Sequence, residues 1–291
     1  MVVFEARGES SGVGNNQDWG TSFASASTSA MSFYDEIMVP RLFDPWAELL
    51  LSQVKLRSGQ AVLDVACGPG TVTRQAAHRV GESGRVTGCD LSPAMLDLAR
   101  SKTSMAVSAR IEYLQCPADS LGVPDDAFDL VTCQQGLQFF PDRPAALAEM
   151  RRALHHDGQL ALSLWCAIQD CPPFAALANA LGRVLGSETA IAYEAGPWGF
   201  SDAESLAQLV EESGFKNVTV RRFELPLVFE GGPAQLLLTL HAASVATTLA
   251  QLPEADLLAL ALAVEEAAGP ITLDGVVRSH AASHIVIAQI E

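Results

Sequence analysis

Residues 62–70 read Val-Leu-Asp-Val-Ala-Cys-Gly-Pro-Gly, and Asp90 stands twenty positions after Gly70. The apolar run 61–65 predicts a short buried strand, and residues 71–80 predict a helix that follows a glycine turn. Such a turn lets a ligand approach bare backbone, and the first turn of a helix offers free N–H groups. An acidic residue at the end of the next strand can accept hydrogen bonds from both hydroxyls of a ribose. The spacing therefore predicts a site for a cofactor that contains a nucleoside.

Two residues discriminate between a dinucleotide and another nucleoside cofactor. The dinucleotide fingerprint has a third glycine, which allows close helix–strand packing, at the position that Thr73 occupies here. Asp64 stands just before the turn, where a carboxylate would repel a pyrophosphate but would suit an ammonium and a sulfonium. Both residues disfavour NAD.

Residues 64–70 resemble motif I of the class I S-adenosylmethionine (SAM) methyltransferases, with Ala66 in place of the first glycine of the motif. Residues 133–142, followed by an arginine-rich helix, resemble the small-molecule methyltransferases related to the ubiquinone/menaquinone methyltransferases. The resemblance is good from about residue 46 to residue 165 and looser afterwards. It implies a SAM-dependent methyltransferase.

The resemblance also implies which residues hold the cofactor. In the family, an aspartate at the place of Asp119 accepts a hydrogen bond from the exocyclic amine of adenine. The cofactor-binding residues expected on this basis are Tyr34, Asp64, Ala66, Cys67, Gly68, Gly70, Asp90, Leu91, Met95, Ala118, Asp119, Ser120, Gln134 and Gln135.

Strand and helix patterns alternate along the chain, which is typical of an α/β fold with a doubly wound parallel sheet. The first five strands are expected at residues 61–65, 84–90, 111–116, 128–133 and 159–165. By its resemblance to the family, the chain should add a sixth strand at 218–228 and a seventh at 284–290. We therefore expect a Rossmann-like, seven-stranded sheet whose last strand is antiparallel.

Two Ala- and Leu-rich segments, 167–199 and 231–274, break this alternation and have helical periodicity. We expect them to form a helical cap, or lid, over the carboxyl edge of the sheet. Residues 1–45 are expected to form a flexible segment and a cap helix, and residues 46–291 the SAM methyltransferase domain. A lid with an apolar lining would exclude water and suit a largely apolar or aromatic acceptor.

Charge and composition disfavour several classes of function. The chain of 291 residues has 18 Lys and Arg against 34 Asp and Glu, a net charge of −16, which disfavours a nucleic-acid partner. Apolar residues make up 49% of the chain, enough for a sizeable core, yet no run approaches the roughly 18 residues of a membrane span. Because no signal-peptide pattern is visible, we expect a cytoplasmic enzyme. The sequence is also compatible with a homodimer.

Six cysteines stand at positions 67, 89, 116, 133, 166 and 171, without a C-x-x-C pair. Five of them lie at, or one residue beyond, the expected carboxyl ends of strands, where thiolates could bind a soft metal. Strand ends are spread along a sheet edge, however, and free cysteine is often a small buried apolar residue. We therefore expect packing beside the cofactor, no disulfide framework and no metal site.

Methyl transfer from a sulfonium is an in-line displacement in which the cofactor carries the reactivity. The protein has to align the acceptor and exclude water, so we expect catalysis mainly by proximity and orientation. Two residues are candidates for a further catalytic role: Gln138, where many relatives carry a histidine, and His241 in the expected lid. Tyr34 and Trp165 are candidates for pocket walls.

The leading hypothesis is methyl transfer from SAM, which leaves S-adenosylhomocysteine (SAH), to an oxygen, nitrogen or carbon atom of a small molecule in specialised metabolism. The alternative from another class is a SAM-binding, non-catalytic regulatory protein. The joint presence of Asp64, Gly68, Gly70, Asp90 and Asp119 disfavours that alternative. An NAD-dependent oxidoreductase is the third and least favoured hypothesis.

Overall fold

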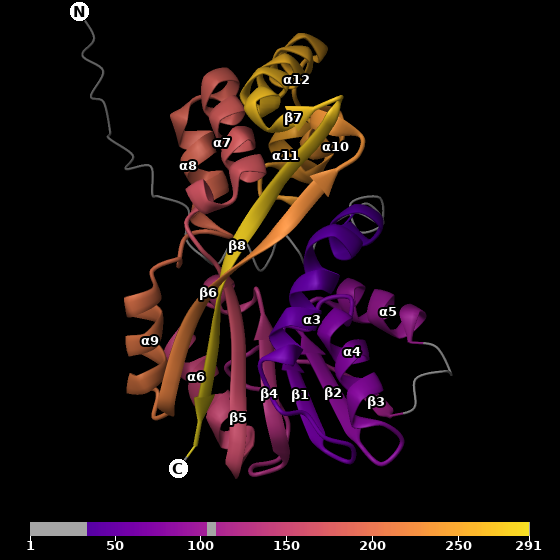
Figure 1. Ribbon diagram of the computed structural model, residues 1–291, viewed down its shortest axis with the longest axis vertical. Coiled ribbons are helices and arrows are strands. Elements are labelled where there is room, and N and C mark those ends of the chain that lie inside the picture. The colour runs from indigo at the N-terminus through magenta and orange to yellow at the C-terminus, as the bar shows by residue number, and fades with distance from the viewer. Residues whose placement is uncertain (1–33, 104–108, 291) are drawn as a thin grey trace, which may run out of the picture.

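The computed structural model describes residues 34–103 and 109–290, so the expected flexible segment lies largely outside the described residues. Within these ranges, eight strands form one sheet in the order β3-β2-β1-β4-β5-β8-β6, with β7 paired to β8 (Figure 1). The strands are β1 (Ala61–Val65), β2 (Arg85–Asp90), β3 (Arg110–Gln115), β4 (Phe128–Gln134), β5 (Leu154–Trp165), β6 (Lys216–Phe229), β7 (Thr272–Leu273) and β8 (Val276–Gln289).

The first five strands run parallel, and β8 is antiparallel to both of its long neighbours, β5 and β6. This topology confirms the predicted Rossmann-like fold with an antiparallel last strand. The additional strand, β7, is a two-residue pairing with the start of β8 that the sequence pattern did not predict.

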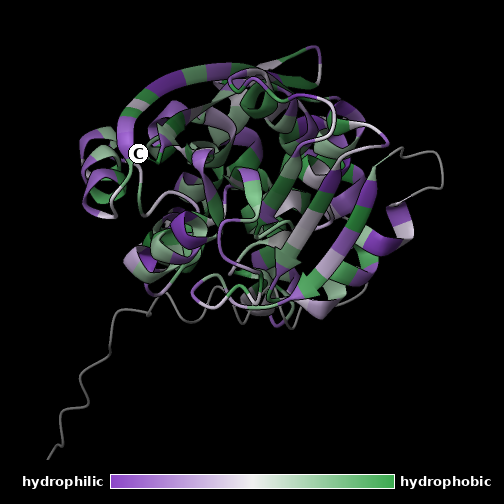
Figure 2. Ribbon diagram, turned by 90° about the horizontal axis from the view of Figure 1, so that it is seen from below, coloured by the Kyte–Doolittle hydropathy of each residue, from purple (hydrophilic) through white to green (hydrophobic). Residues whose placement is uncertain are grey.

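Helices cover both faces of the sheet, as the hydropathy-coloured view in Figure 2 also shows. On one face lie α3 (Asp44–Ser52) and α4 (Thr71–Val80), and on the other α6 (Arg143–Ala153) and α9 (Ala203–Glu212), while α5 (Pro93–Lys102) packs beside β2 and β3. Successive strand residues point to opposite faces, so Val62 lies in the core under α3 and α4 and Leu63 in the core under α6 and α9. Burial of every β1 residue explains its apolar sequence.

A helical layer lies beyond the carboxyl ends of the strands, and we call it the cap. It consists of α7 (Pro172–Leu185), α8 (Ser187–Ala195), α10 (Gly232–Leu238), η4 (Thr239–Ala242), α11 (Ala246–Leu249), α12 (Glu254–Ala268) and η5 (Gly269–Ile271). Leu177, Leu236 and Val264 are fully buried in a core that the cap shares with η1 (Tyr34–Phe43). Both Ala- and Leu-rich segments therefore contribute to this layer. No helix in the described ranges is long and apolar enough to cross a membrane.

The strands β6 and β8 join the cap to the sheet. Each has 14 residues, and Figure 1 shows both running from the sheet into the cap. Val286 lies in a core of the sheet, whereas Phe229 and Val277, which pair with each other, lie in the cap core. The last strand thus begins well before residue 284, the position at which we expected it to start. Residues 278–283 have little β propensity, but their pairing with β6 makes them extended all the same.

Candidate functional site

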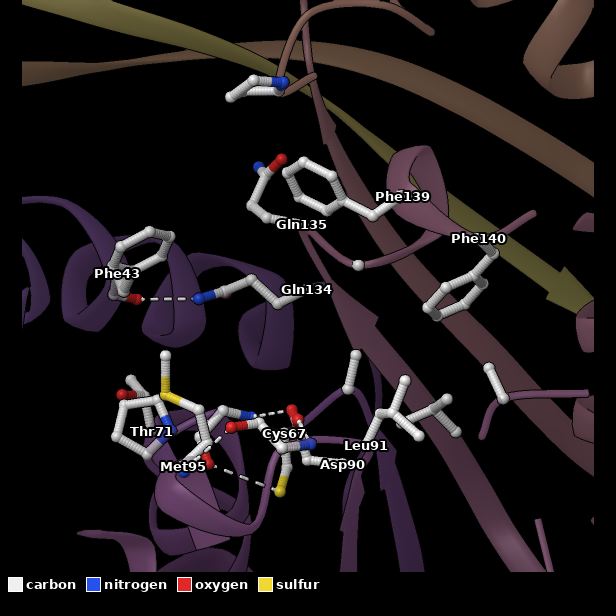
Figure 3. Close-up of a pocket in the computed structure, with 18 of the residues that line it drawn as sticks. Phe43, Cys67, Thr71, Asp90, Leu91, Met95, Gln134, Gln135, Phe139 and Phe140 are labelled. Carbon is white, nitrogen blue, oxygen red and sulfur yellow. Dashed lines mark hydrogen bonds between the residues drawn. The ribbon is translucent and has the colours of Figure 1, made fainter. Parts of the chain in front are cut away.

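A cavity of about 600 Å³ lies between the carboxyl ends of the strands and the cap. The ends of β1, β2 and β4 and the loops that follow them line one side of it. The other side consists of η1, the end of β5 and residues of α7, α8 and η4. Figure 3 shows Cys67, in the loop after β1, and Asp90, at the end of β2, across from Gln135, Phe139 and Phe140. This is the edge at which open α/β sheets bind ligands.

Most of the residues expected to bind the cofactor line this cavity. Gly70 and Ser120 are the two exceptions. The expected residues that line the cavity are Tyr34, Asp64, Ala66, Cys67, Gly68, Asp90, Leu91, Met95, Ala118, Asp119, Gln134 and Gln135. Gly70 precedes α4 with a φ of 76°, and a Cβ there would lie 2.7 Å from the hydroxyl of Tyr113. Its role in the structure is therefore close packing.

Asp64 is 1% exposed and accepts hydrogen bonds from the hydroxyls of Thr73, at 2.6 Å, and Thr132, at 2.9 Å. Burial raises the pKa of Asp64 to about 6, and the two hydroxyls oppose that rise. Gly88 on the neighbouring strand leaves room for the Thr73 side chain, because a Cβ at Gly88 would lie only 3.0 Å from Thr73 Oγ1. A glycine on β2 thus makes room for a threonine at the dinucleotide glycine position.

Asp90, at the end of β2, is held by backbone amides. Its Oδ2 accepts a hydrogen bond from the N–H of Gly68 and its Oδ1 one from the N–H of Ser92, both at 2.8 Å. These bonds fix the carboxylate and leave acceptor capacity on each oxygen for a ligand. Burial raises the pKa of Asp90. The adjacent Leu91 is 52% exposed and offers a ligand ring an apolar surface (Figure 3).

The loop between β1 and α4 has an unusual backbone. Ala66, Gly68 and Gly70 have φ angles of 55°, 52° and 76°. The left-handed region costs a residue with a Cβ about 1–2 kcal/mol, so Ala66 is strained where the motif has glycine. A Cβ on Gly68 would meet nothing within 4 Å, so open space adjoins the backbone there.

The helix η1 lies over the cavity and contacts both β4 and α5. Tyr34 and Phe43, at its two ends, stack with ring centroids 5.0 Å apart. Gln134 Nε2 donates a hydrogen bond of 3.0 Å to the carbonyl of Phe43, and Lys102 on α5 forms an ion pair with Asp35. These contacts hold η1 against β4 and α5.

Aromatic side chains form much of the remaining wall: Phe139, Phe140, Trp165, Phe174, Tyr193 and Trp198. The ring of Trp198 packs against those of Phe174, at 5.3 Å, and Tyr193, at 5.4 Å between centroids. Among the described residues that line the cavity there is no Lys, Arg or His, whereas Asp occurs at positions 64, 90, 119 and 142. This charge pattern suits a cationic or neutral ligand and opposes a pyrophosphate.

Neither candidate for a further catalytic role lines the cavity. Gln138 is 2% exposed and donates a hydrogen bond of 3.3 Å to Gln135 Oε1, so it supports a lining residue. His241 has an exposed side chain, while Thr239 and Ala243 on either side of it reach the cavity. The expectation that His241 faces the acceptor is therefore corrected: the short turn η4 directs its neighbours inward instead.

Sequence reasoning did not single out Phe174, Tyr193 and Trp198. They are isolated aromatic residues in the Ala- and Leu-rich segment 167–199, and that contrast was the available signal. Tyr34 and Trp165, which were singled out, do line the cavity.

The cysteines near the site are free thiols. Three of them line the cavity, Cys67, Cys89 and Cys116. Burial raises the pKa of Cys67 well above its ordinary value, so this side chain stays a neutral thiol. A neutral, buried thiol fits the expected role of a small packing residue beside the cofactor.

A model of the ubiE/COQ5 methyltransferase family matches residues 21–228. The chain belongs to this family. The ubiquinone/menaquinone biosynthesis C-methyltransferase UbiE of Xylella fastidiosa (strain M23) is 35% identical over 147 residues, which are 49% of this chain and 58% of the relative. The demethylmenaquinone methyltransferase of Listeria monocytogenes serotype 4a is 32% identical over 188 residues, 61% of this chain and 79% of the relative. The chain therefore spans only part of the length of these relatives.

Solved structures share the fold. The YcgJ protein of Bacillus subtilis superposes with a TM-score of 0.55 at 18% identity, covering 84% of this chain and 98% of that chain. A SAM-dependent methyltransferase of Aquifex aeolicus gives a TM-score of 0.51 at 22% identity, covering 68% and 93%. Both comparisons agree with the Rossmann-like sheet.

Membership of this methyltransferase family agrees with the predicted class of enzyme and with its predicted cofactor. The residues present fit SAM, which supplies an electrophilic methyl group on a sulfonium when bound. The carboxylates of the cavity match its positive charges. In addition, Thr71 Oγ1 and Gln134 Oε1, both in lining residues, are buried without a hydrogen-bond partner in the described part of the chain.

Proposed function

We propose that this chain transfers a methyl group from SAM to a small, largely apolar or aromatic acceptor, mainly by proximity and orientation. One observation carries the proposal: a single cavity extends from the carboxylates at the ends of β1 and β2 to the aromatic wall of the cap. A cationic cofactor suits the first part and a flat apolar ring the second. The chain's own residues would align the two ligands and keep water out.

Three aspartates would hold the cofactor. Asp64 would face the ammonium of the methionine part, and Asp90 would accept hydrogen bonds from the ribose hydroxyls. Asp119, which is exposed and lines the cavity, would accept a hydrogen bond from the adenine amine. Leu91 and Met95 would give the adenine ring an apolar contact surface.

The Xylella relative points to a carbon atom as the methyl acceptor. The Xylella relative is a C-methyltransferase of quinone biosynthesis, so a quinol-type ring is the first acceptor to test. The family match ends at residue 228, before α10, η4, α11 and α12. Thr239 and Ala243, which line the cavity, come from that unmatched part. The acceptor of this chain can therefore differ from that of the relatives in size and substituents.

Other features support the expected cellular setting. The net charge of −16 supports an acceptor other than a nucleic acid. Six free cysteines support a reducing cytoplasm. The homodimer stays a prediction, which light scattering of the purified protein would test.

Release of SAH from SAM tests the proposed reaction. We expect release with quinols, naphthols and other uncharged ring acceptors, and none with RNA, DNA or phosphorylated metabolites. Binding of SAH without release from any acceptor would instead support the non-catalytic alternative. Release with nucleic acid and with none of the ring compounds would contradict the proposal.

A pair of variants links the reaction to the cap. Phe174→Ala truncates the aromatic wall and should raise the acceptor KM, while the Kd of SAH stays unchanged. Leu258→Ala removes a side chain on α12 that is 62% exposed and does not line the cavity, so it should change neither constant. Equal effects of the two substitutions would place the acceptor elsewhere.

A further inference from the structure

Tyr193 has an unpaired hydroxyl in the wall of the cavity. The residue lies near the end of α8 and is 3% exposed. Its hydroxyl makes no hydrogen bond to any residue that the structure describes, and it is not enclosed by protein atoms as Trp198 Nε1 is. A hydroxyl that has no protein partner and is not enclosed is free to bond a ligand that enters the cavity.

Two polar side chains near this part of the wall are already engaged. Thr239 Oγ1 donates a hydrogen bond of 2.7 Å to the carbonyl of Leu236. Gln135 Nε2 donates one of 3.1 Å to Ser283 Oγ, and Gln135 Oε1 accepts one from Gln138. Among the described lining residues that come from α7, α8 and η4, Tyr193 alone therefore retains an unused hydroxyl donor.

The surroundings of Tyr193 determine which ligand group suits it. The ring of Trp198 lies 5.4 Å from that of Tyr193, so a flat ligand can pack beside them. Burial raises the pKa of Tyr193 well above its ordinary value, so the hydroxyl stays protonated and can donate. No basic residue is present among the described lining residues to hold an anionic group. An uncharged oxygen is the matching acceptor of the hydrogen bond.

We propose that Tyr193 is the polar anchor of the methyl acceptor, and that its hydroxyl donates a hydrogen bond to an uncharged oxygen on a ring compound. The acceptor class is then a ring ketone, quinol or related oxygenated ring. This inference rests on the proposed function for the place of the acceptor. The hydrogen bond would fix the rotation of an otherwise apolar ring, and so decide which ring atom meets the methyl group.

Two probes that differ by one oxygen test the anchor: 1-tetralone, a ring ketone, and tetralin, the matching hydrocarbon. Each is titrated calorimetrically into the full chain saturated with SAH. We expect wild type to bind 1-tetralone about tenfold more tightly than tetralin, a difference of about 1.4 kcal/mol. Tyr193→Phe keeps the ring and should abolish this preference by weakening 1-tetralone binding, with tetralin unchanged.

Tyr113→Phe is the matched control, because Tyr113 does not line the cavity and its hydroxyl is bonded to Thr103 at 2.9 Å. This variant should keep the tenfold preference. Thermal unfolding serves as a second readout, and the Tm of Tyr193→Phe should equal that of wild type, since no hydrogen bond within the protein is lost.

Three results would overturn the anchor: a preference of equal size in wild type and Tyr193→Phe, no preference in wild type, or no binding of either probe by wild type. Because the readout is binding, it is separate from turnover. A protein that shows the tenfold preference but releases no SAH with any acceptor would uphold the anchor and contradict the proposed reaction.

Discussion

Thr73 donates a hydrogen bond of 2.6 Å to Asp64, so the residue at the place of the third dinucleotide glycine is a partner of the carboxylate that precedes the glycine turn. The two features that disfavoured a dinucleotide are therefore one structural unit. Without a carboxylate at position 64, a threonine at position 73 would leave a buried hydroxyl without this partner.

Replacement of Thr73 by valine should weaken cofactor binding. Thr73→Val keeps the shape of the side chain but removes one of the two hydroxyls that hold Asp64. A hydrogen bond to a charged group contributes about 1.5–3 kcal/mol, so we expect the Kd of SAH to rise at least tenfold. Calorimetry at pH 7 measures it. Thr219→Val, an exposed substitution on β6, is the control and should leave the Kd unchanged.

The pKa of Asp64 predicts two opposite responses to pH. The folded-state value of about 6 lies above the ordinary value of 3.8, so between them the folded protein holds more protons than the unfolded chain. The stability of the free protein should therefore fall as pH rises from 4 through 6. SAH affinity should rise over the same interval, because the ammonium needs the ionised carboxylate.

Asp64→Asn separates these responses from those of other groups. Thermal unfolding and calorimetry at pH 4, 5, 6 and 7 would show the part of each dependence that this variant removes. If Asp64→Asn keeps both dependences in full, Asp64 is not the group that titrates.

Asp90→Ala should weaken SAH binding far more than Asp125→Ala. Asp90 is fixed by two backbone amides beside the cavity, and loss of hydrogen bonds from a charged group to ribose corresponds to about a ten- to hundredfold rise in Kd. Asp125 was expected to be a solvated turn residue. It is 76% exposed and pairs with Arg152, a contact of small net energy. Equal Kd values for the two variants would mean that Asp90 does not bind the ribose.

Ala66→Gly should stabilise the chain slightly or leave it unchanged. Glycine would relieve about 1–2 kcal/mol of strain at a φ of 55°. It would also add about 0.5–1 kcal/mol of unfolded-chain entropy, so the net gain lies between zero and about 1.5 kcal/mol. Ala66→Val should destabilise, since a β-branched residue is disfavoured there. Denaturant unfolding measures both, and a clear loss of stability in Ala66→Gly would contradict the strain at this residue.

The sheet and the cofactor side could be predicted because their signals are local. Strand and helix periods, the N-caps Ser92 and Asp202 and the glycine turn each depend on a few neighbouring residues. The start of β8 could not be predicted this way. Residues 278–283 are extended only because they pair with residues of β6 that stand fifty or more positions earlier in the chain.

The acceptor side of the cavity was harder to predict, because it too depends on contacts between distant parts of the chain. Lid segments could be recognised from their composition, but which residues face the cavity depends on how α8 and η4 pack. His241 was a candidate for its chemistry and points outward, whereas Tyr193 had no motif and lines the wall. The hydrogen bond from Thr73 to Asp64 joins a helix to a strand and was likewise visible only in three dimensions.

Calorimetric titration of the full chain with SAH and, separately, with NAD tests the central claim most directly. The carboxylates at positions 64 and 90 and the lack of a basic residue among the described lining residues predict binding of SAH and no heat from NAD. Binding of NAD without binding of SAH would contradict the account.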